Sequence, residues 1–421
     1  MKTVGVIGLG YIGLPTAGLL AESGCRVLGV DVQELVVNTI NAGKIHLHEP
    51  GLEQVIQRAV ASGNLSATLT PAPCDVFLIA VPTPFKDGFA PDISYVESAT
   101  RLIVPVLKNG DLIILESTVP VGTTARVQEI VLELRPELLR SKNPVEFAHC
   151  PERVLPGKII EELVNNDRIV GGLSESATRR ACEFYKVFVK GQIVPTDART
   201  AELCKLSENA FRDVNIAFAN ELSMICEKLG IDVWELIDLA NRHPRVKILQ
   251  PGPGVGGHCI PVDPWFIVDS APELAHLIRT AREVNTSKTH HIIETIQAKL
   301  KHSSVKAIAC FGFAFKANVD DFRESPAMEI IEAIAADPQI TIFAVEPHAK
   351  SLPASLARFG NVKLVSIEDA LKNSEVVTML VEHREFGILT AENLRGKQIV
   401  DTRGVWRKLD LAGEPAIRKA S

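Results

Sequence analysis

Near its start the chain carries three glycines in the spacing Gly8-x-Gly10-x-x-Gly13, between the apolar run Val4–Gly8 and a helical pattern. This feature constrains the fold more than any other in the sequence. In a dinucleotide-binding turn the first glycine permits a tight bend, the second lets the backbone approach a pyrophosphate, and the third lets helix pack on strand. The helix N-terminus then offers its N–H groups to the phosphates. We therefore predict that the chain begins with a doubly wound α/β domain.

Asp31 follows the next apolar run, Arg26–Val30. A carboxylate at that place can bind both hydroxyls of a ribose, and no arginine follows it closely, so NAD is favoured over NADP. A flavin or other nucleotide site, or a glycine turn without a ligand, is the alternative.

Further apolar runs continue this pattern and predict strands at Val76–Val81, Leu112–Leu115 and Arg168–Val170. From Leu203 apolar residues instead recur every three or four positions up to Gly230, which predicts one long helix, followed by helices at Val233–Asn241 and Pro272–Leu300. Strands then return, at Val305–Phe311, Ile340–Val345, Val362–Val365, Val376–Val381 and Gln398–Asp401. The predicted fold is α/β, with two Rossmann-like doubly wound domains joined by a central helical domain with one long helix. The predicted boundaries are 1–198, 199–300 and 301–421.

Composition excludes several classes of protein. The formal net charge is −6, so the chain lacks the basic footprint of a nucleic-acid-binding protein. No apolar stretch has the length of a membrane helix. The eight cysteines are scattered, without CxxC pairs or metal-ligand spacing, so we expect a reduced, cytoplasmic protein with no metal site.

The segment Pro251–Pro264 contains four glycines within six positions, followed by Cys259 and Asp263. Such a density of glycine suits a backbone that passes close to a ligand. A thiolate is a strong nucleophile that captures aldehydes, and the loop places Cys259 as one. The other seven cysteines are expected to be small core residues.

Three polar residues, Lys205, Asn209 and Arg212, share one face of the long helix because they are spaced by four and three. Lysine and asparagine together can stabilise an alkoxide or a tetrahedral oxyanion. A solvated polar stripe is the alternative.

Thr83, Thr118 and Glu152 follow strands of the first sheet, at the edge where doubly wound folds bind ligands. Glu152 is suited to act as a general base, although ordinary loop and capping chemistry is the alternative. In the second sheet, Lys316 and Arg323 follow the first strand and are suited to bind phosphate. Surface ion pairing with Asp320, Asp321 and Glu324 is the alternative there.

Together these motifs resemble the UDP-sugar 6-dehydrogenase family, in that family's order and over nearly the whole chain. The resemblance implies an NAD-binding domain, a central domain that forms a homodimer, and a C-terminal domain that binds UDP. It implies the following catalytic residues: Cys259 as thioester nucleophile, Lys205 and Asn209 for the oxyanion, Glu152 for thioester hydrolysis, and Asp263 with Thr118 for water and base chemistry. It implies the following cofactor contacts: Gly8, Gly10, Tyr11, Ile12, Gly13, Asp31, Thr83, Thr118 and Arg323. It implies the following substrate contacts: Glu152, Arg153, Lys205, Asn209, Arg212, His243, Arg245, Gly256, Phe315 and Lys316.

One departure bears on the sugar. UDP-glucose dehydrogenases usually carry Cys-x-Pro-Lys-Asp, whereas Val262 stands here at the lysine position. With Arg242-His243-Pro-Arg245 and Asp401-Thr-Arg-Gly-Val-Trp406, the chain resembles the UDP-N-acetylmannosamine dehydrogenase branch, whose products enter cell-surface polysaccharides. The expected reaction is four-electron oxidation of the sugar C6 alcohol to a uronic acid. UDP-N-acetylglucosamine or UDP-glucose is the alternative substrate, and a non-catalytic NAD-binding module is the alternative from another class.

Overall fold

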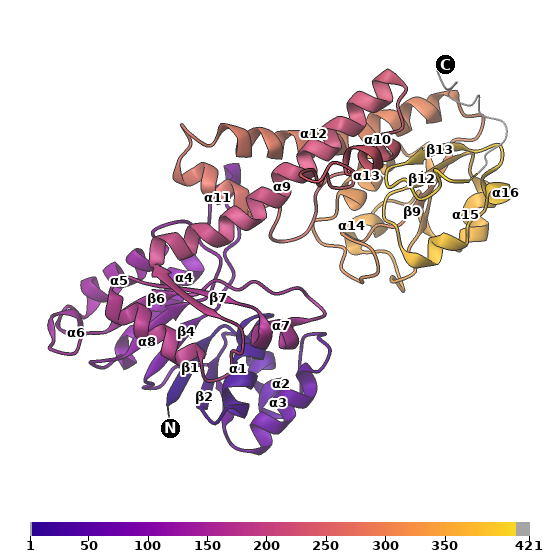
Figure 1. Cartoon of the computed structure of the whole chain (residues 1–421). Coiled ribbons are helices and arrows are strands. Elements are labelled where there is room, and N and C mark those ends of the chain that lie inside the picture. Colours follow the sequence, from indigo (N-terminus) through magenta and orange to yellow (C-terminus); the bar gives the residue numbers. More distant parts are fainter. Residues whose placement is uncertain (1, 410–421) are drawn as a thin grey trace. The chain divides into compact units, whose positions relative to one another are not determined.

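The computed structural model describes residues 2–409 and contains two compact units (Figure 1). Within the described residues, unit 1 comprises residues 2–208 with Trp265–Pro272, and unit 2 comprises Asn209–Pro264 with residues 273–409. The boundary between them falls within the long helix α9, Ala198–Leu229. The division of the chain at residues 198 and 300 stays a prediction.

Unit 1 is built on an eight-stranded sheet with the order β3-β2-β1-β4-β5-β6-β7-β8. Its strands are β1 Thr3–Ile7, β2 Arg26–Val30, β3 Leu65–Thr68, β4 Val76–Ile79, β5 Leu112–Leu115, β6 Glu146–His149, β7 Arg168–Gly172 and β8 Ile193–Asp197. The central strands β4 and β5 are buried throughout, as strands covered on both faces should be. Neighbouring strands are parallel, except that β7 runs antiparallel to β6.

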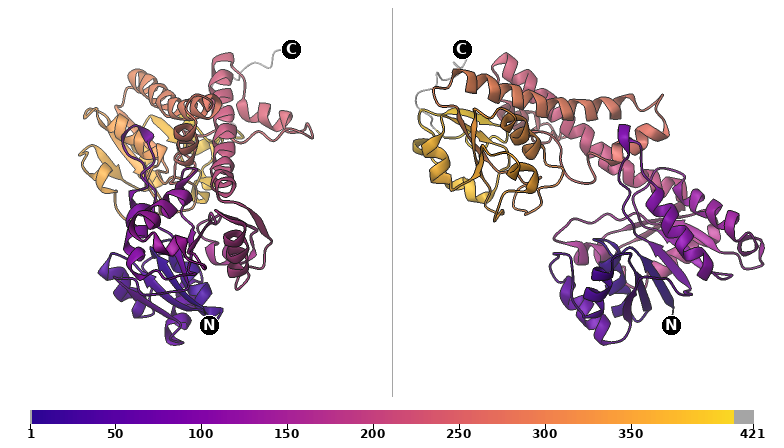
Figure 2. Two further views of the ribbon diagram at one scale, coloured as in Figure 1. Left: turned by 90° about the vertical axis from the view of Figure 1, so that its left-hand side faces the viewer. Right: turned by 180° about the vertical axis from the view of Figure 1, so that it is seen from behind.

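Helices cover both faces of this sheet (Figure 2). They are α1 Gly13–Glu22, α2 Glu34–Asn41, α3 Leu52–Ala61, α4 Ser94–Ile103, α5 Thr123–Leu134, α6 Glu137–Arg140, α7 Ile159–Asn165 and α8 Glu175–Tyr185. One apolar core joins α1, α3 and α8 to one face, and a second joins α4 and α5 to the other. This sandwich leaves the ends of the strands, rather than their faces, to carry a site.

The middle of the chain is helical. Beside α9 it contains α10 Val233–Ala240, α11 Asp263–Ser270 and α12 His276–His302. In unit 2, α9 and α12 are joined by buried hydrogen bonds, among them Asn220 Nδ2 to Asn285 Oδ1 at 2.9 Å. None of the helices within residues 2–409 is long and apolar enough to cross a lipid bilayer.

Unit 2 also contains a five-stranded parallel sheet with the order β11-β10-β9-β12-β13. Its strands are β9 Ala307–Phe311, β10 Thr341–Val345, β11 Val362–Leu364, β12 Val376–Met379 and β13 Gln398–Asp401. Its helices are α13 Pro326–Ala335, α14 Ala354–Ala357, α15 Ile367–Asn373 and α16 Ala391–Leu394. The order of its strands repeats the order β3-β2-β1-β4-β5 of unit 1.

These observations confirm the predicted α/β class, with two doubly wound sheets and one long helix. They also correct it in detail, because the pattern missed β3, β6 and β8. The edge strand β8 is mostly exposed and contains Pro195, so it lacks an apolar run. The loop predicted through Pro264 ends earlier, because α11 begins at Asp263. The antiparallel pairing of β6 with β7 was not expected either.

Candidate active site

The first glycine turn has the geometry that the sequence predicted. Gly8 has a φ of +89°, and a Cβ added there would lie 2.6 Å from the carbonyl oxygen of Ala80. A Cβ on Gly13 would lie 1.9 Å from the Gly8 carbonyl oxygen, so α1 packs on the turn only because this residue has no side chain. A Cβ on Gly10, by contrast, would meet nothing within 4 Å. The backbone at Gly10 therefore faces open space, as a turn that receives a pyrophosphate requires.

Asp31 is fixed beside this turn. One carboxylate oxygen accepts the Leu9 N–H at 3.0 Å, and the other accepts the Gln33 N–H at 3.0 Å. Each oxygen keeps a further lone pair, and the side chain is half-buried, so the carboxylate remains able to accept ribose hydroxyls. The residues of this turn thus fit a dinucleotide.

The loops after β4 and β5 are joined at the same edge of the sheet. Thr83 Oγ1 donates to the Thr118 carbonyl oxygen at 2.5 Å, and Ser117 Oγ donates to the Val81 carbonyl oxygen at 2.6 Å. Two of the predicted cofactor residues, Thr83 and Thr118, are therefore neighbours. Tyr11 is exposed, and Ile12 directly precedes α1.

Glu152 lies in the loop after β6 and is buried. Its Oε1 accepts the N–H of Arg153 at 2.6 Å, and its Oε2 lies 2.9 Å from Nη1 of the buried Arg168. Arg153 turns its guanidinium to Glu208 of α9, with Nη2 2.6 Å from Oε1. The predicted general base is thus held by an arginine, Arg168, that sequence reasoning did not single out.

Asn209 of α9 and Asp263 at the start of α11 form a buried pair, in which Asn209 Nδ2 donates to Asp263 Oδ2 at 2.5 Å. The N–H of Asp263 donates to the Cys259 carbonyl oxygen at 2.9 Å. The pair brings together two residues predicted to be catalytic from positions 54 apart in sequence. Lys205 lies one turn before Asn209 and is half-buried, whereas Arg212 is exposed.

Cys259 alone is exposed among the eight cysteines, all of which lie in the described part of the chain. The glycines before it pack on unit 2's C-terminal sheet domain. Gly257 donates its N–H to the Glu324 carbonyl oxygen at 3.1 Å, and its φ is +93°. A Cβ on Gly257 would lie 3.2 Å from the ring of Phe315, and one on Gly256 would lie 2.6 Å from the Glu324 carbonyl oxygen. The glycines therefore let this loop lie directly on the segment that follows β9.

A buried polar network, not predicted from the sequence, supports the start of the same loop. Asp213 accepts from Arg282 Nη1 at 2.6 Å and from Asn285 Nδ2 at 2.8 Å. Asn285 in turn accepts from Asn220, whose Oδ1 accepts the Gly252 N–H at 2.9 Å. Polar residues at the core-facing positions of two helices were the sequence signal that could have revealed this network, because a buried polar side chain needs a buried hydrogen-bond partner.

The segment after β9 repeats the first glycine turn. Gly312 has a φ of +82° and donates its N–H to the Val345 carbonyl oxygen at 2.9 Å, as Gly8 does to that of Val30 at 2.8 Å. Glu346 accepts the N–H of Phe313 at 2.8 Å and so stands where Asp31 stands in unit 1. The two sheets therefore share a turn as well as a strand order.

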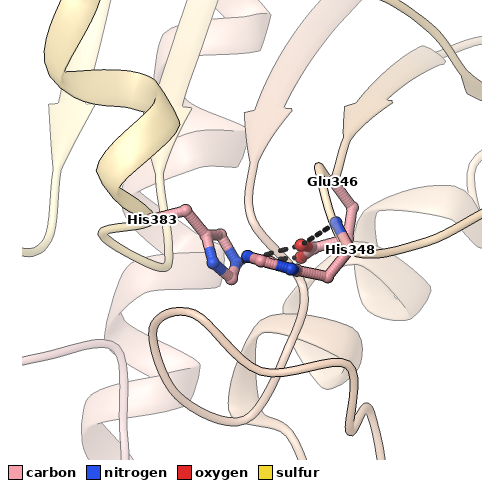
Figure 3. Close-up of side chains that lie close together, drawn as sticks. All are labelled: Glu346, His348 and His383. Carbon is pink, nitrogen blue, oxygen red and sulfur yellow. Dashed lines mark hydrogen bonds and ion pairs between the residues drawn. The ribbon is translucent and has the colours of Figure 1, made fainter.

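Glu346, His348 and His383 form the one group of potential metal ligands found among residues 2–409 (Figure 3). The hydrogen bonds of the group account for its geometry. His383 Nδ1 accepts the Asn318 N–H at 2.9 Å, so the neutral ring carries its proton on Nε2, which lies 3.1 Å from Glu346. Burial opposes ionisation of Glu346, but the bonds from His383 and Phe313 lower its pKa overall. Both ring nitrogens of His383 are engaged in this way, so the hydrogen bond between Glu346 and His383 links the segments that follow β10 and β12.

The other predicted substrate residues are placed less tightly. The Lys316 ammonium lies 5.4 Å from the centre of the Phe315 ring. Arg323 bonds Asp321 through two nitrogens, with Nη2 2.7 Å from Oδ2, which is the ion pairing that the sequence left open as an alternative. His243 and Arg245 are exposed in the loop after α10.

These features define a class of protein. A Rossmann-type turn with a carboxylate beside it, a second turn of the same kind, and an exposed cysteine on a glycine loop indicate a dinucleotide-dependent dehydrogenase with a second nucleotide site.

Comparison with known proteins identifies the family. Three domain models of the UDP-glucose/GDP-mannose dehydrogenase family match the chain: the NAD binding domain over residues 2–189, the central domain over 199–287 and the UDP binding domain over 309–408. The chain belongs to this family and is an NAD-dependent UDP-sugar dehydrogenase, an oxidoreductase.

Relatives match over nearly their full length. The chain is 54% identical over 410 residues to an NDP-N-acetyl-D-galactosaminuronic acid dehydrogenase from Ralstonia nicotianae, covering 96% of each protein. It is 53% identical over 418 residues to the UDP-N-acetyl-D-mannosamine dehydrogenase of Escherichia coli, covering 96% of this chain and 99% of the other. A solved UDP-N-acetyl-mannosamine dehydrogenase from Staphylococcus aureus is 42% identical with a TM-score of 0.84, covering 96% of this chain and 95% of the other.

Proposed function

We propose that this protein oxidises the C6 alcohol of UDP-N-acetyl-D-mannosamine to the uronic acid, in two hydride steps through a thioester on Cys259. The observation that carries the proposal is the exposure of Cys259 at the end of a loop in which glycines are required by close packing. An exposed thiol is open to a nucleophilic role, whereas the five buried cysteines are held as core residues.

The proposed roles divide the chemistry among few side chains. Two NAD molecules, bound one after the other, would each accept one hydride. Lys205 and Asp263 hold a water that receives the proton of the C6 hydroxyl, and the aldehyde left after hydride loss is attacked by the Cys259 sulfur. Lys205 and Asn209 stabilise the resulting oxyanion. A second hydride loss leaves the thioester, and Glu152 takes a proton from the water that hydrolyses it.

Covalent capture gives this scheme a physical rationale. A free aldehyde is reactive and can diffuse away between the two oxidations, whereas a thiohemiacetal stays attached to the enzyme. The buried Asn209–Asp263 pair supports the scheme. The Asp263 carboxylate holds the Asn209 amide in place, and the backbone N–H of Asp263 bonds to the carbonyl oxygen of Cys259.

The choice of sugar follows from two lines of support. The curated relatives named above act on N-acetylated amino sugars, judging by their names, and Val262 replaces the lysine typical of UDP-glucose dehydrogenases. We propose that Arg212, His243 and Arg245 contact the acetamido sugar and that Lys316 and Phe315 contact the nucleotide part. UDP-N-acetylglucosamine and UDP-glucose are the competing substrates.

The experiment is NADH production with a panel of UDP-sugars, with the acid product measured in parallel. We expect two NADH per acid and the highest kcat/KM with the mannosamine derivative. One NADH per sugar indicates a simple alcohol dehydrogenase, absence of net NADH indicates an epimerase, and NAD binding without turnover of any sugar indicates a non-catalytic module.

Cys259→Ser tests the thioester directly. Acid release should fall at least about a thousandfold, because a serine hydroxyl is a far weaker nucleophile at neutral pH. Cys182→Ser, at a half-buried cysteine of α8, is the matched control and should leave turnover unchanged. Normal acid release by the Cys259 variant contradicts the mechanism.

We also propose a homodimer in the cytoplasm, with the second copy covering the apolar stripe on α9. Phe211, Phe218, Ile225 and Leu229 of unit 2 are exposed and spaced by seven, seven and four residues. This is the spacing by which two helices pack along a shared seam.

A further inference from the structure

Five buried side chains of unit 1 meet where β5, β6 and β7 lie side by side under α8. Glu116 follows β5, Cys150 and Glu152 follow β6, Arg168 begins β7, and Tyr185 ends α8. Each is at most 9% exposed. Of the five, only Glu152 has a place in the proposed reaction.

The Arg168 guanidinium pairs with one carboxylate of this cluster, Glu152, and acts on the other, Glu116, through its charge. Arg168 Nη1 lies 2.9 Å from Glu152 Oε2, and its Nη2 donates to the Leu163 carbonyl oxygen at 3.3 Å. The guanidinium carbon also lies 5.1 Å from the centre of the Tyr185 ring. Arg168 is thereby held in one orientation by an ion pair, a carbonyl and an aromatic face.

Glu116 is the second carboxylate. Its Oε1 accepts from the Tyr185 hydroxyl at 2.6 Å, while its Oε2 has no hydrogen-bond partner within residues 2–409. Burial raises the pKa of Glu116 to about 7, although the charge of Arg168 opposes the shift. The Glu116 carboxyl therefore changes its charge near neutral pH. Because it is buried, that change acts strongly on the neighbouring charged side chains.

The groups that face Glu116 come from every element packed around it: Arg168 on β7, Glu152 and Cys150 after β6, and Tyr185 on α8. Burial raises the pKa of Cys150 to about 12, and Tyr185 also has a pKa raised by burial, so both stay neutral. The charge that Glu152 experiences therefore depends on Arg168 and on the protonation of Glu116.

We propose that Arg168 is a positioning residue for Glu152, and that Glu116, held by Tyr185, sets the basicity of Glu152 through Arg168. The inference rests on the proposed role of Glu152 in thioester hydrolysis. In that step water attacks the thioester carbon, its proton passes to Glu152, and the C–S bond breaks to release the acid and the Cys259 thiolate. Arg168 orients the Glu152 carboxylate. The positive charge of Arg168 also makes Glu152 a weaker base, and an ionised Glu116 offsets part of that charge.

The first test uses Arg168→Lys, with Arg180→Lys as control. Arg180 pairs with Glu146 at 2.6 Å, at the opposite end of β6 from Glu152. Lysine keeps the charge but loses the planar fork, so we expect hydrolysis to slow about tenfold to a hundredfold. The early burst of NADH should remain, and mass spectrometry should find the sugar acyl group on Cys259. Arg180→Lys should show neither change, and identical behaviour of the two variants overturns the proposal.

The second test uses Glu116→Gln, which keeps an oxygen for the Tyr185 hydroxyl and removes the titrating group. Because Glu116 has a pKa of about 7, the hydrolysis rate of the wild type should rise through about pH 7 as Glu116 ionises, and this step should be absent in Glu116→Gln. A merely structural role leaves the step in place. A step that persists in Glu116→Gln overturns the proposal even where Arg168→Lys fails to fold.

A third variant separates this inference from the proposed function. Glu152→Gln should accumulate the acyl adduct on Cys259. If it does not, the role of Glu152 in the proposed function fails. If it does, while Arg168→Lys and Glu116→Gln behave as wild type, only the present inference fails.

Discussion

The buried ion pair between Asp213 of α9 and Arg282 of α12 allows a quantitative prediction for Arg282→Met. The side chain of Asp213 is 0% exposed and that of Arg282 is 7% exposed, with 2.6 Å between Oδ1 and Nη1. Burial raises the pKa of Asp213, although Arg282 opposes the shift. The variant keeps an apolar side chain of similar length but leaves the carboxylate without its counter-charge.

Removing one partner of a buried pair costs about 3–5 kcal/mol, because the other charge stays desolvated. Domains of this size lose roughly 2–4 °C in melting temperature per kcal/mol. We therefore expect the unfolding of unit 2 to shift down by about 10 °C. Because the same network reaches the Gly252 N–H through Asn285 and Asn220, activity should fall as well.

The assay is urea and thermal unfolding followed by tryptophan fluorescence. Trp234 and Trp406 lie in unit 2, and Trp265 lies in unit 1, so a Trp265→Phe background makes the signal report on unit 2 alone. Arg126→Met is the matched control in unit 1, and its unfolding is measured in the protein that keeps Trp265. Arg126 contacts Glu97 at 2.8 Å near the surface, where solvent screens the pair, so this variant should unfold at nearly the same temperature as its parent.

The double variant Asp213→Leu/Arg282→Met gives the decisive comparison. Replacing both charges with apolar side chains removes the unpaired charge, so this variant should be more stable than Arg282→Met alone. If Arg282→Met costs less than about 1 kcal/mol, or if the two substitutions simply add, the reasoning from desolvation is refuted.

Two further predictions concern the surface of α9 and the pH dependence of unit 1. Phe218→Asp places a charge in the exposed apolar stripe and should yield monomers in sedimentation experiments, and a variant that stays dimeric contradicts the proposed seam. Hydrogen bonds from Thr3 and the ion pair with Lys108 lower the pKa of Asp75 from 3.8 to about 2. Because this pKa is depressed on folding, the stabilisation is present above about pH 4 and is lost as the pH falls towards 2. Asp75→Asn should therefore lower the melting temperature at pH 7 by more than at pH 3, and an equal loss at both values contradicts the assignment.

Features that depend on local pattern could be predicted from the sequence. The glycine spacing at Gly8 and Gly13 predicts a turn and a close helix contact, because only glycine tolerates the backbone angle and the approach. Strands covered on both faces have uninterrupted apolar runs, and the runs of β4, β5 and β9 were predicted on that ground and are buried throughout. Polar or exposed edge strands such as β8 were missed, because their pairing depends on neighbours that the local sequence does not show.

For the site, the sequence by itself determined which residues are candidates for the chemistry: Cys259 after its glycines, Asp31 after its strand, and polar side chains at helical spacing on α9. Only the tertiary structure decided which of them meet. It paired Asn209 with Asp263, placed Glu152 against Arg168, and tied Arg323 to Asp321. The physical reason is that a buried polar group must find its partner in space, and that partner is chosen by packing between elements far apart along the chain.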